Sequence, residues 1–170
     1  MRKLLVVVAV LAAAGISAVP AGAAMLFQAN LNGLQEVGPN NSPGTGYGTV
    51  LLNDAENLIT VNENWSGLLA PATASHIHGP ALPGVNAGVL FPLSGVPAAT
   101  AGTIPEQSFA ISAAQVVQLK GGLYYFNVHT SAYPGGEIRG QIVIPEPSAF
   151  VVVACGLASV AGFVRRKKKA

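Results

Sequence analysis

Short runs in which apolar and polar residues alternate make up the middle of the chain, and turns rich in glycine, proline and asparagine separate them. Alternation with a period of two is typical of strands with one buried face. It predicts strands near residues 25–31, 48–53, 58–66, 73–78, 89–93, 107–111, 123–129 and 137–144. A short helix is expected over residues 113–119, with Ser112 as N-cap and Gly121 closing it. About eight strands at this spacing predict an all-β fold, a Greek-key β-sandwich or flattened barrel.

The first residues follow a different pattern, that of an export signal. Arg2 and Lys3 precede the apolar run 4–19, which Pro20 interrupts before the small residues 21–23. This order is typical of a secretory signal peptide, here residues 1–23, cleaved by signal peptidase after Ala23. An uncleaved anchor helix is the alternative, because the apolar run is long for a signal peptide.

A second uncharged run lies near the C-terminus. Residues 148–164 carry no charge, and the basic cluster 165–169 follows them. This length is close to the minimum for a transmembrane helix, and a basic cluster after it is expected to stay cytoplasmic. The domain at residues 24–144 would then lie outside the membrane, as the signal peptide also requires.

Charge is unevenly divided between the ends and the middle. Seven of the nine basic residues lie at the termini, whereas residues 25–146 carry two basic and seven acidic residues, a formal charge near −5. Such a domain has no basic patch for phosphates, which argues against binding of nucleic acid. Cys155, the single cysteine, lies in the C-terminal apolar run, so no disulfide is expected in the exported domain.

Three histidines are the most chemically suggestive residues of the domain. His76 and His78 lie two positions apart, so they share one face of the predicted strand, while Ile77 points to the core. His129 lies on an outer face if Phe126 and Val128 point inward; the opposite assignment of these two is the alternative.

If the two strands are neighbours, the three imidazoles can converge on one copper or zinc ion, since both metals accept nitrogen ligands. The simpler alternative is that the histidines cap loops or bond to backbone near Gly79-Pro80 and Pro134-Gly135.

Other motifs indicate no catalytic centre. Arg139 and Glu137 are expected to form an ion pair on the outer face of the last strand, unless Arg139 attracts an anionic ligand toward the histidines. The glycine-rich stretch 44–48 is interpreted as a plain turn, because the spacing and the helix of a phosphate loop are missing. No Gly-x-Ser-x-Gly elbow or visible carboxylate pair occurs, so hydrolase chemistry is not expected.

The C-terminal residues 145–170 resemble the PEP-CTERM sorting signal of Gram-negative bacteria. Pro145, Glu146 and Pro147 are followed by the apolar run and the basic cluster. The resemblance implies processing by an exosortase near the Pro-Glu-Pro motif. A permanent single-pass anchor is the alternative.

The domain itself resembles the CHRD family, from about residue 26 to 144. Four blocks carry the resemblance: Leu-Asn-Gly-Leu-Gln-Glu-Val at 31–37 with Asn-Ser-Pro-Gly-Thr-Gly at 41–46, Ala-Ser-His-Ile-His-Gly-Pro-Ala at 74–81, Asn-Val-His-Thr at 127–130, and Pro-Gly-Gly-Glu-Ile-Arg-Gly-Gln-Ile at 134–142. It implies a β-sandwich module without established enzymatic activity.

A fainter resemblance links the same blocks to copper/zinc superoxide dismutase. His76, His78 and His129 match three copper ligands of that family in type and order. A fourth, bridging histidine, the zinc ligands and the disulfide cysteines are missing, which puts dismutase activity in doubt.

Two functions are consistent with these patterns. The first is a non-enzymatic module at the surface or in the extracellular matrix of a Gram-negative bacterium, contacting polysaccharide or surface proteins in adhesion or biofilm. The second is an envelope protein that binds copper or zinc through its three histidines, with or without redox activity.

Overall fold

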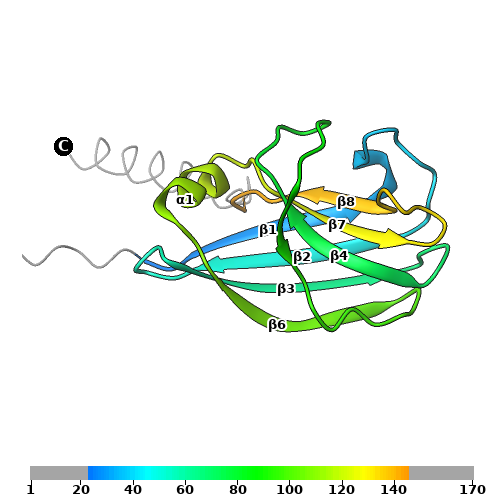
Figure 1. Cartoon of the computed structure of the whole chain (residues 1–170), viewed down its shortest axis with the longest axis horizontal. Helices are drawn as coiled ribbons and strands as arrows, with labels where there is room; N and C mark the ends of the chain where they lie inside the picture. The colour runs from blue at the N-terminus through cyan, green and yellow to red at the C-terminus, as the bar shows by residue number, and fades with distance from the viewer. Residues whose placement is uncertain (1–22, 146–170) are drawn as a thin grey trace, which may run out of the picture.

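The computed structural model describes residues 23–145 of the chain. Their elements are β1 (Met25–Asn32), η1 (Gly33–Gln35), β2 (Thr45–Leu52), β3 (Leu58–Ser66), β4 (Ala72–His78), β5 (Val89–Pro92), β6 (Gly102–Ala110), α1 (Ala113–Lys120), β7 (Tyr125–Thr130) and β8 (Ile138–Gln141). The predicted all-β class is confirmed, and each predicted strand has a counterpart (Figure 1). The expected helix is also present, with Ser112 and Gln115 forming a capping box at its start.

The segments predicted to direct export lie mostly outside these residues. Residues 1–22, the run 148–164 and the basic cluster are not described, nor are Glu146 and Pro147 of the sorting motif. Within residues 23–145, no helix has the length and apolar character needed to cross a membrane.

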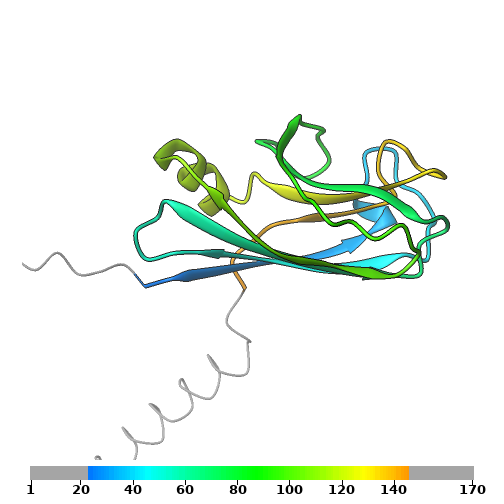
Figure 2. The same ribbon diagram turned by 60° about the horizontal axis from the view of Figure 1, so that its bottom comes forward.

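The strands form one antiparallel sheet that folds over on itself. Their order is β5-β4-β7-β8-β1-β2-β3-β6. In Figure 2, β4 and β7 lie in one layer and β2, β3 and β6 in the other. The rings of Phe91 and Phe109, on the two end strands β5 and β6, lie 5.2 Å apart. The sheet therefore nearly closes into a flattened barrel.

Alternate residues of the strands fill the space between the layers, as the sequence pattern predicts. Ile77, Phe126 and Val128 are all buried in this core, so the inward assignment of Phe126 and Val128 is confirmed. The other large core side chains include Phe27, Leu31, Val50, Leu52, Ile59, Trp65, Ile104, Ile138 and Ile142. Burial of this apolar surface is the main stabilising term of a domain in which no disulfide can form.

The start of β6 and the end of β8 differ from the prediction. β6 begins at Gly102 rather than near residue 107, and it includes Pro105, which a strand tolerates here because β6 is an edge of the sheet. β8 ends at Gln141 rather than near residue 144, and Ile144 is 48% exposed.

The expectation of a plain turn at residues 44–48 was wrong, because β2 already begins at Thr45. A Cβ atom on Gly48 would lie 2.5 Å from the ring of Phe126 in the opposite layer. The glycines of this stretch thus allow close packing within the sandwich rather than a turn.

Candidate metal centre

The three histidines of the chain lie together on one face of two neighbouring strands. His76 and His78 belong to β4 and His129 to β7, and these strands pair antiparallel, with His76 opposite Asn127 and Ala74 opposite His129. One ligand atom from each imidazole falls within 4.8 Å of the other two. The closest approach is 3.1 Å, between Nδ1 of His76 and Nε2 of His129.

Backbone carbonyls fix the orientation of two of the rings. Nδ1 of His78 lies 3.0 Å from the Ala87 carbonyl oxygen, and Nδ1 of His129 lies 3.0 Å from that of Pro134. Because a carbonyl oxygen only accepts hydrogen bonds, both Nδ1 atoms carry a proton, and each Nε2 presents a lone pair. A carbonyl behind an imidazole is the usual way in which proteins orient a metal-binding histidine.

Nε2 of His78 is the atom of the cluster that most clearly lacks a partner. It is buried, and no hydrogen-bond partner for it exists among the described residues. A buried polar atom without a partner costs about 1–3 kcal/mol, so it needs an explanation. A metal ion between the three imidazoles would supply the missing partner.

Burial favours the neutral form of all three imidazoles. Burial is the main reason why the pKa of His76 is lowered to about 4, and the nearby His129 and His78 lower it further. Burial also lowers the pKa of His78 and of His129. The hydrogen bonds to the Ala87 and Pro134 carbonyls act in the opposite direction but do not outweigh it. Neutral imidazole is the form that binds a metal.

Tyr125 forms one wall of the cluster, a role that no motif in the sequence predicts. Its ring stacks on His78 with centroids 5.1 Å apart and an interplanar angle of 9°. Its hydroxyl accepts a hydrogen bond from the Ala87 backbone N–H, at 3.0 Å. Tyr125 thus holds the same peptide segment that orients His78. The one sequence signal for this role is the spacing along β7: Tyr125 lies two residues before Asn127 and four before His129, so all three share a face.

The predicted outer face is not open to solvent at this point. Loop residues 79–88 and 131–136 cover part of it, since they supply Ala87 and Pro134. His78 is 8% exposed, and His76 and His129 are half-buried. The backbone bond of His129 near Pro134 agrees with the simpler alternative of the sequence analysis, but it uses Nδ1 and leaves Nε2 directed at His76.

The expected ion pair between Glu137 and Arg139 was wrong. Glu137 precedes β8 and is fully buried, and it accepts hydrogen bonds from Ser42 Oγ, the Leu69 backbone N–H and Thr130 Oγ1. Arg139 instead lies on the face of the Tyr125 ring, with Cζ 3.4 Å from the ring centroid. Alternation of side chains fails here because Glu137 lies outside the strand.

Among the described residues, the histidines form the single group of three or more potential metal ligands. A set of three imidazoles without a carboxylate suits zinc or copper and disfavours magnesium or calcium, which prefer oxygen ligands. Three protein ligands also leave a position for water or another ligand.

Comparison with known proteins identifies the domain. The family model of the CHRD domain matches residues 27–142, most of the chain. Searches of curated proteins and of solved structures give no significant match. The match spans the strands that carry all three histidines and confirms the resemblance of the sequence blocks, so the chain belongs to the CHRD domain family.

Proposed function

We propose that this CHRD protein is an exported module that binds one copper or zinc ion through His76, His78 and His129. The unpartnered, buried Nε2 of His78 carries the proposal, because the lone pair of His129 lies within reach of the same point. Bonds from Nδ1 of His78 and His129 to carbonyls preset both rings for Nε2 ligation.

Elemental analysis tests this proposal directly. The full chain, purified in detergent, is exposed to zinc or copper and then freed of loose metal. The proposal predicts about one ion per chain, and loss of that ion in a His76→Ala/His78→Ala variant. Asn62→Ala, on the other layer of the barrel, is the control. Absence of stoichiometric metal in the parent chain would refute the proposal, and retained metal in the double variant would show that other residues bind it.

The protein is proposed to bind the metal ion without using it in catalysis. Superoxide dismutase activity is the weaker alternative, since a redox-active ion with an open position would be needed. The residues that would form a second, zinc-type centre in the dismutase family have no counterpart in the sequence.

A second proposal concerns contact with the cell surface. We infer that the module is sorted by its C-terminal signal through signal peptidase and exosortase, and that it contacts extracellular polysaccharide or surface proteins. The sorting-signal pattern of residues 145–170 and the acidic charge of the domain support this role. Deletion of residues 145–170 should release or misplace the domain; unchanged retention in the envelope would contradict the sorting part of the proposal.

A further inference from the structure

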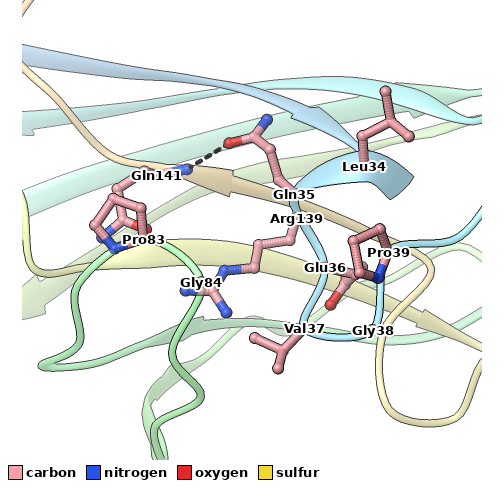
Figure 3. Close-up of a pocket in the computed structure, with 10 residues that line it drawn as sticks. All are labelled: Leu34, Gln35, Glu36, Val37, Gly38, Pro39, Pro83, Gly84, Arg139 and Gln141. Carbon is pink, nitrogen blue, oxygen red and sulfur yellow. Dashed lines mark hydrogen bonds between the residues drawn. The ribbon is translucent and has the colours of Figure 1, made fainter.

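A pocket lies on the same face as the histidines but beyond Tyr125. It has a volume of about 330 Å³, near the lower end for small-molecule sites. Figure 3 shows Arg139 reaching between two loop segments, one with Glu36 and Val37 and the other with Pro83 and Gly84. Gln141 lines the pocket beside Arg139.

Arg139 supplies hydrogen-bond donors to this pocket. It donates to the Val85 carbonyl oxygen at 2.9 Å and to Asn86 Oδ1 at 3.3 Å. These bonds use two of the five N–H groups of the guanidinium. The ring of Tyr125 and the two bonds fix the guanidinium in place, so its remaining donors are preorganised.

Glu36 supplies an acceptor to the same pocket through Oε2, since Oε1 is buried. The residue is 7% exposed, and neither carboxyl oxygen accepts a hydrogen bond from the described residues; Oε1 is fully buried. Glu36 and Arg139 form no ion pair, since Lys120 and Glu56 form the single one within residues 23–145. A buried carboxyl group thus faces a pocket that also holds a buried guanidinium, and the two do not satisfy one another.

Gln141 adds a further acceptor. Its amide nitrogen donates to the carbonyl oxygens of Ala81 and Gly122, at 3.0 and 2.7 Å. Because both partners only accept, the amide orientation is settled, and the side-chain oxygen is left without a donor among the described residues.

This combination of groups selects the ligand by its chemistry. An anion would meet the Glu36 carboxyl group, and a cation would meet Arg139. A neutral hydroxyl group suits both, because it donates to a carboxyl oxygen and accepts from a guanidinium at once. Pro39, Pro83, Val37 and the 71% exposed Leu34 give the rim an apolar character that suits the C–H faces of a sugar ring.

We propose that the pocket between Glu36 and Arg139 binds a sugar residue of a neutral polysaccharide through neighbouring hydroxyl groups. The inference rests on the proposed contact with extracellular polysaccharide, and it gives that contact a site. It does not depend on a metal ion, because none of the three histidines lines the pocket.

The test is a binding titration of neutral gluco-, galacto- and manno-oligosaccharides to the full chain, in a detergent without a sugar headgroup. Saturation-transfer NMR reports contact, and titration gives the affinity. Glu36→Ala should weaken binding about tenfold, as loss of one hydrogen bond does. The variant should fold, since the Glu36 side chain accepts no hydrogen bond. Val37→Trp, at the half-exposed rim, should block binding sterically.

Glu106→Ala is the matched control, because it removes an exposed carboxyl group from β6 on the other layer. Affinity unchanged in both Glu36→Ala and Val37→Trp would overturn the pocket while leaving polysaccharide contact at another surface. Absence of any oligosaccharide binding would overturn both the sugar pocket and the proposed contact with polysaccharide. Tighter binding of glucuronate or of N-acetylglycinamide would overturn the choice of a neutral sugar in favour of an anion or a peptide.

Discussion

Nδ1 of His76 lies 3.1 Å from Nε2 of His129, although 53 positions separate the two residues in the chain. They lie on neighbouring strands but are not direct cross-strand partners, since His76 pairs with Asn127. Their contact is therefore diagonal, and it follows from the regular register in which Ala74 pairs with His129 and His76 with Asn127. The pairing of β4 with β7 thus assembles the candidate metal centre.

Tyr125→Phe should weaken metal binding by roughly tenfold while leaving the fold intact. The substitution keeps the ring that stacks on His78, but it removes the hydroxyl that holds the Ala87 segment. Loss of such an outer-shell contact typically costs 10–100-fold in metal affinity. Competition titration with a zinc chelator measures the change. Tyr47→Phe, which removes an exposed hydroxyl bonded to Gln28, should have no effect; equal losses in the two variants would argue against the role of Tyr125.

Glu63→Gln should remove part of the pH dependence of stability. Glu63 points into the core, where burial raises its pKa to about 8, against the lowering effect of the Ser75 hydrogen bond. Its ordinary pKa is 4.5, so the folded state holds the proton more tightly than the unfolded state. The stabilisation is complete below pH 4.5 and is lost as pH rises toward 8, by up to about 1.4 kcal/mol per pH unit.

Urea unfolding at pH 5.5 and pH 8 measures this difference. The variant should lose less stability than the parent between the two values, and it should be the more stable protein at pH 8. Burial also raises the pKa of Glu36 to about 7, although Arg139 opposes this, so some slope should remain in the variant. Identical slopes in parent and variant would count against a buried, protonated Glu63.

Glu137→Ala should destabilise the domain by roughly 3 kcal/mol or more. The carboxylate is fully buried and accepts three hydrogen bonds, at 2.5–2.7 Å, which tie together loops distant in sequence. Its removal leaves the Leu69 backbone N–H and two hydroxyl groups without this partner. Chemical denaturation measures the loss. The control Glu106→Ala, at an exposed position, should change stability by less than about 0.5 kcal/mol. An effect as small for Glu137→Ala would show that Glu137 does not stabilise the loops it bonds to.

Gly48→Ala should cost roughly 1–3 kcal/mol, as overpacking of a core does. The new methyl group would lie 2.5 Å from Cε2 of Phe126, across the sandwich. Gly88→Ala is the comparison, because nothing lies within 4 Å of a Cβ atom there. Thermal unfolding compares the variants, and equal stability of the two would contradict the tight contact between β2 and β7.

Alternation along the chain was sufficient to predict the strands, the short helix and the inward positions of Ile77, Phe126 and Val128. The same parity placed His76, His78 and His129 on outer faces. The pairing of β4 with β7 was not predictable, because it joins segments about 50 residues apart by contacts that leave no local pattern. Carbonyl partners such as Ala87 belong to irregular loops, whose backbone directions no side-chain pattern encodes. Arg139 shows the same limit, since its stacking on Tyr125 depends on strand neighbours and not on spacing.

The most direct test of the metal centre is equilibrium dialysis of the full chain against Cu²⁺, combined with electron paramagnetic resonance of the bound ion. The account predicts one tightly bound ion per chain whose nitrogen hyperfine pattern requires three imidazoles. Single His76→Ala, His78→Ala and His129→Ala variants should each lose more than roughly 100-fold in affinity, because loss of an outer-shell partner alone costs 10–100-fold. Absence of Cu²⁺ binding by the parent, or binding by all three variants as tight as that of the parent, would contradict the account.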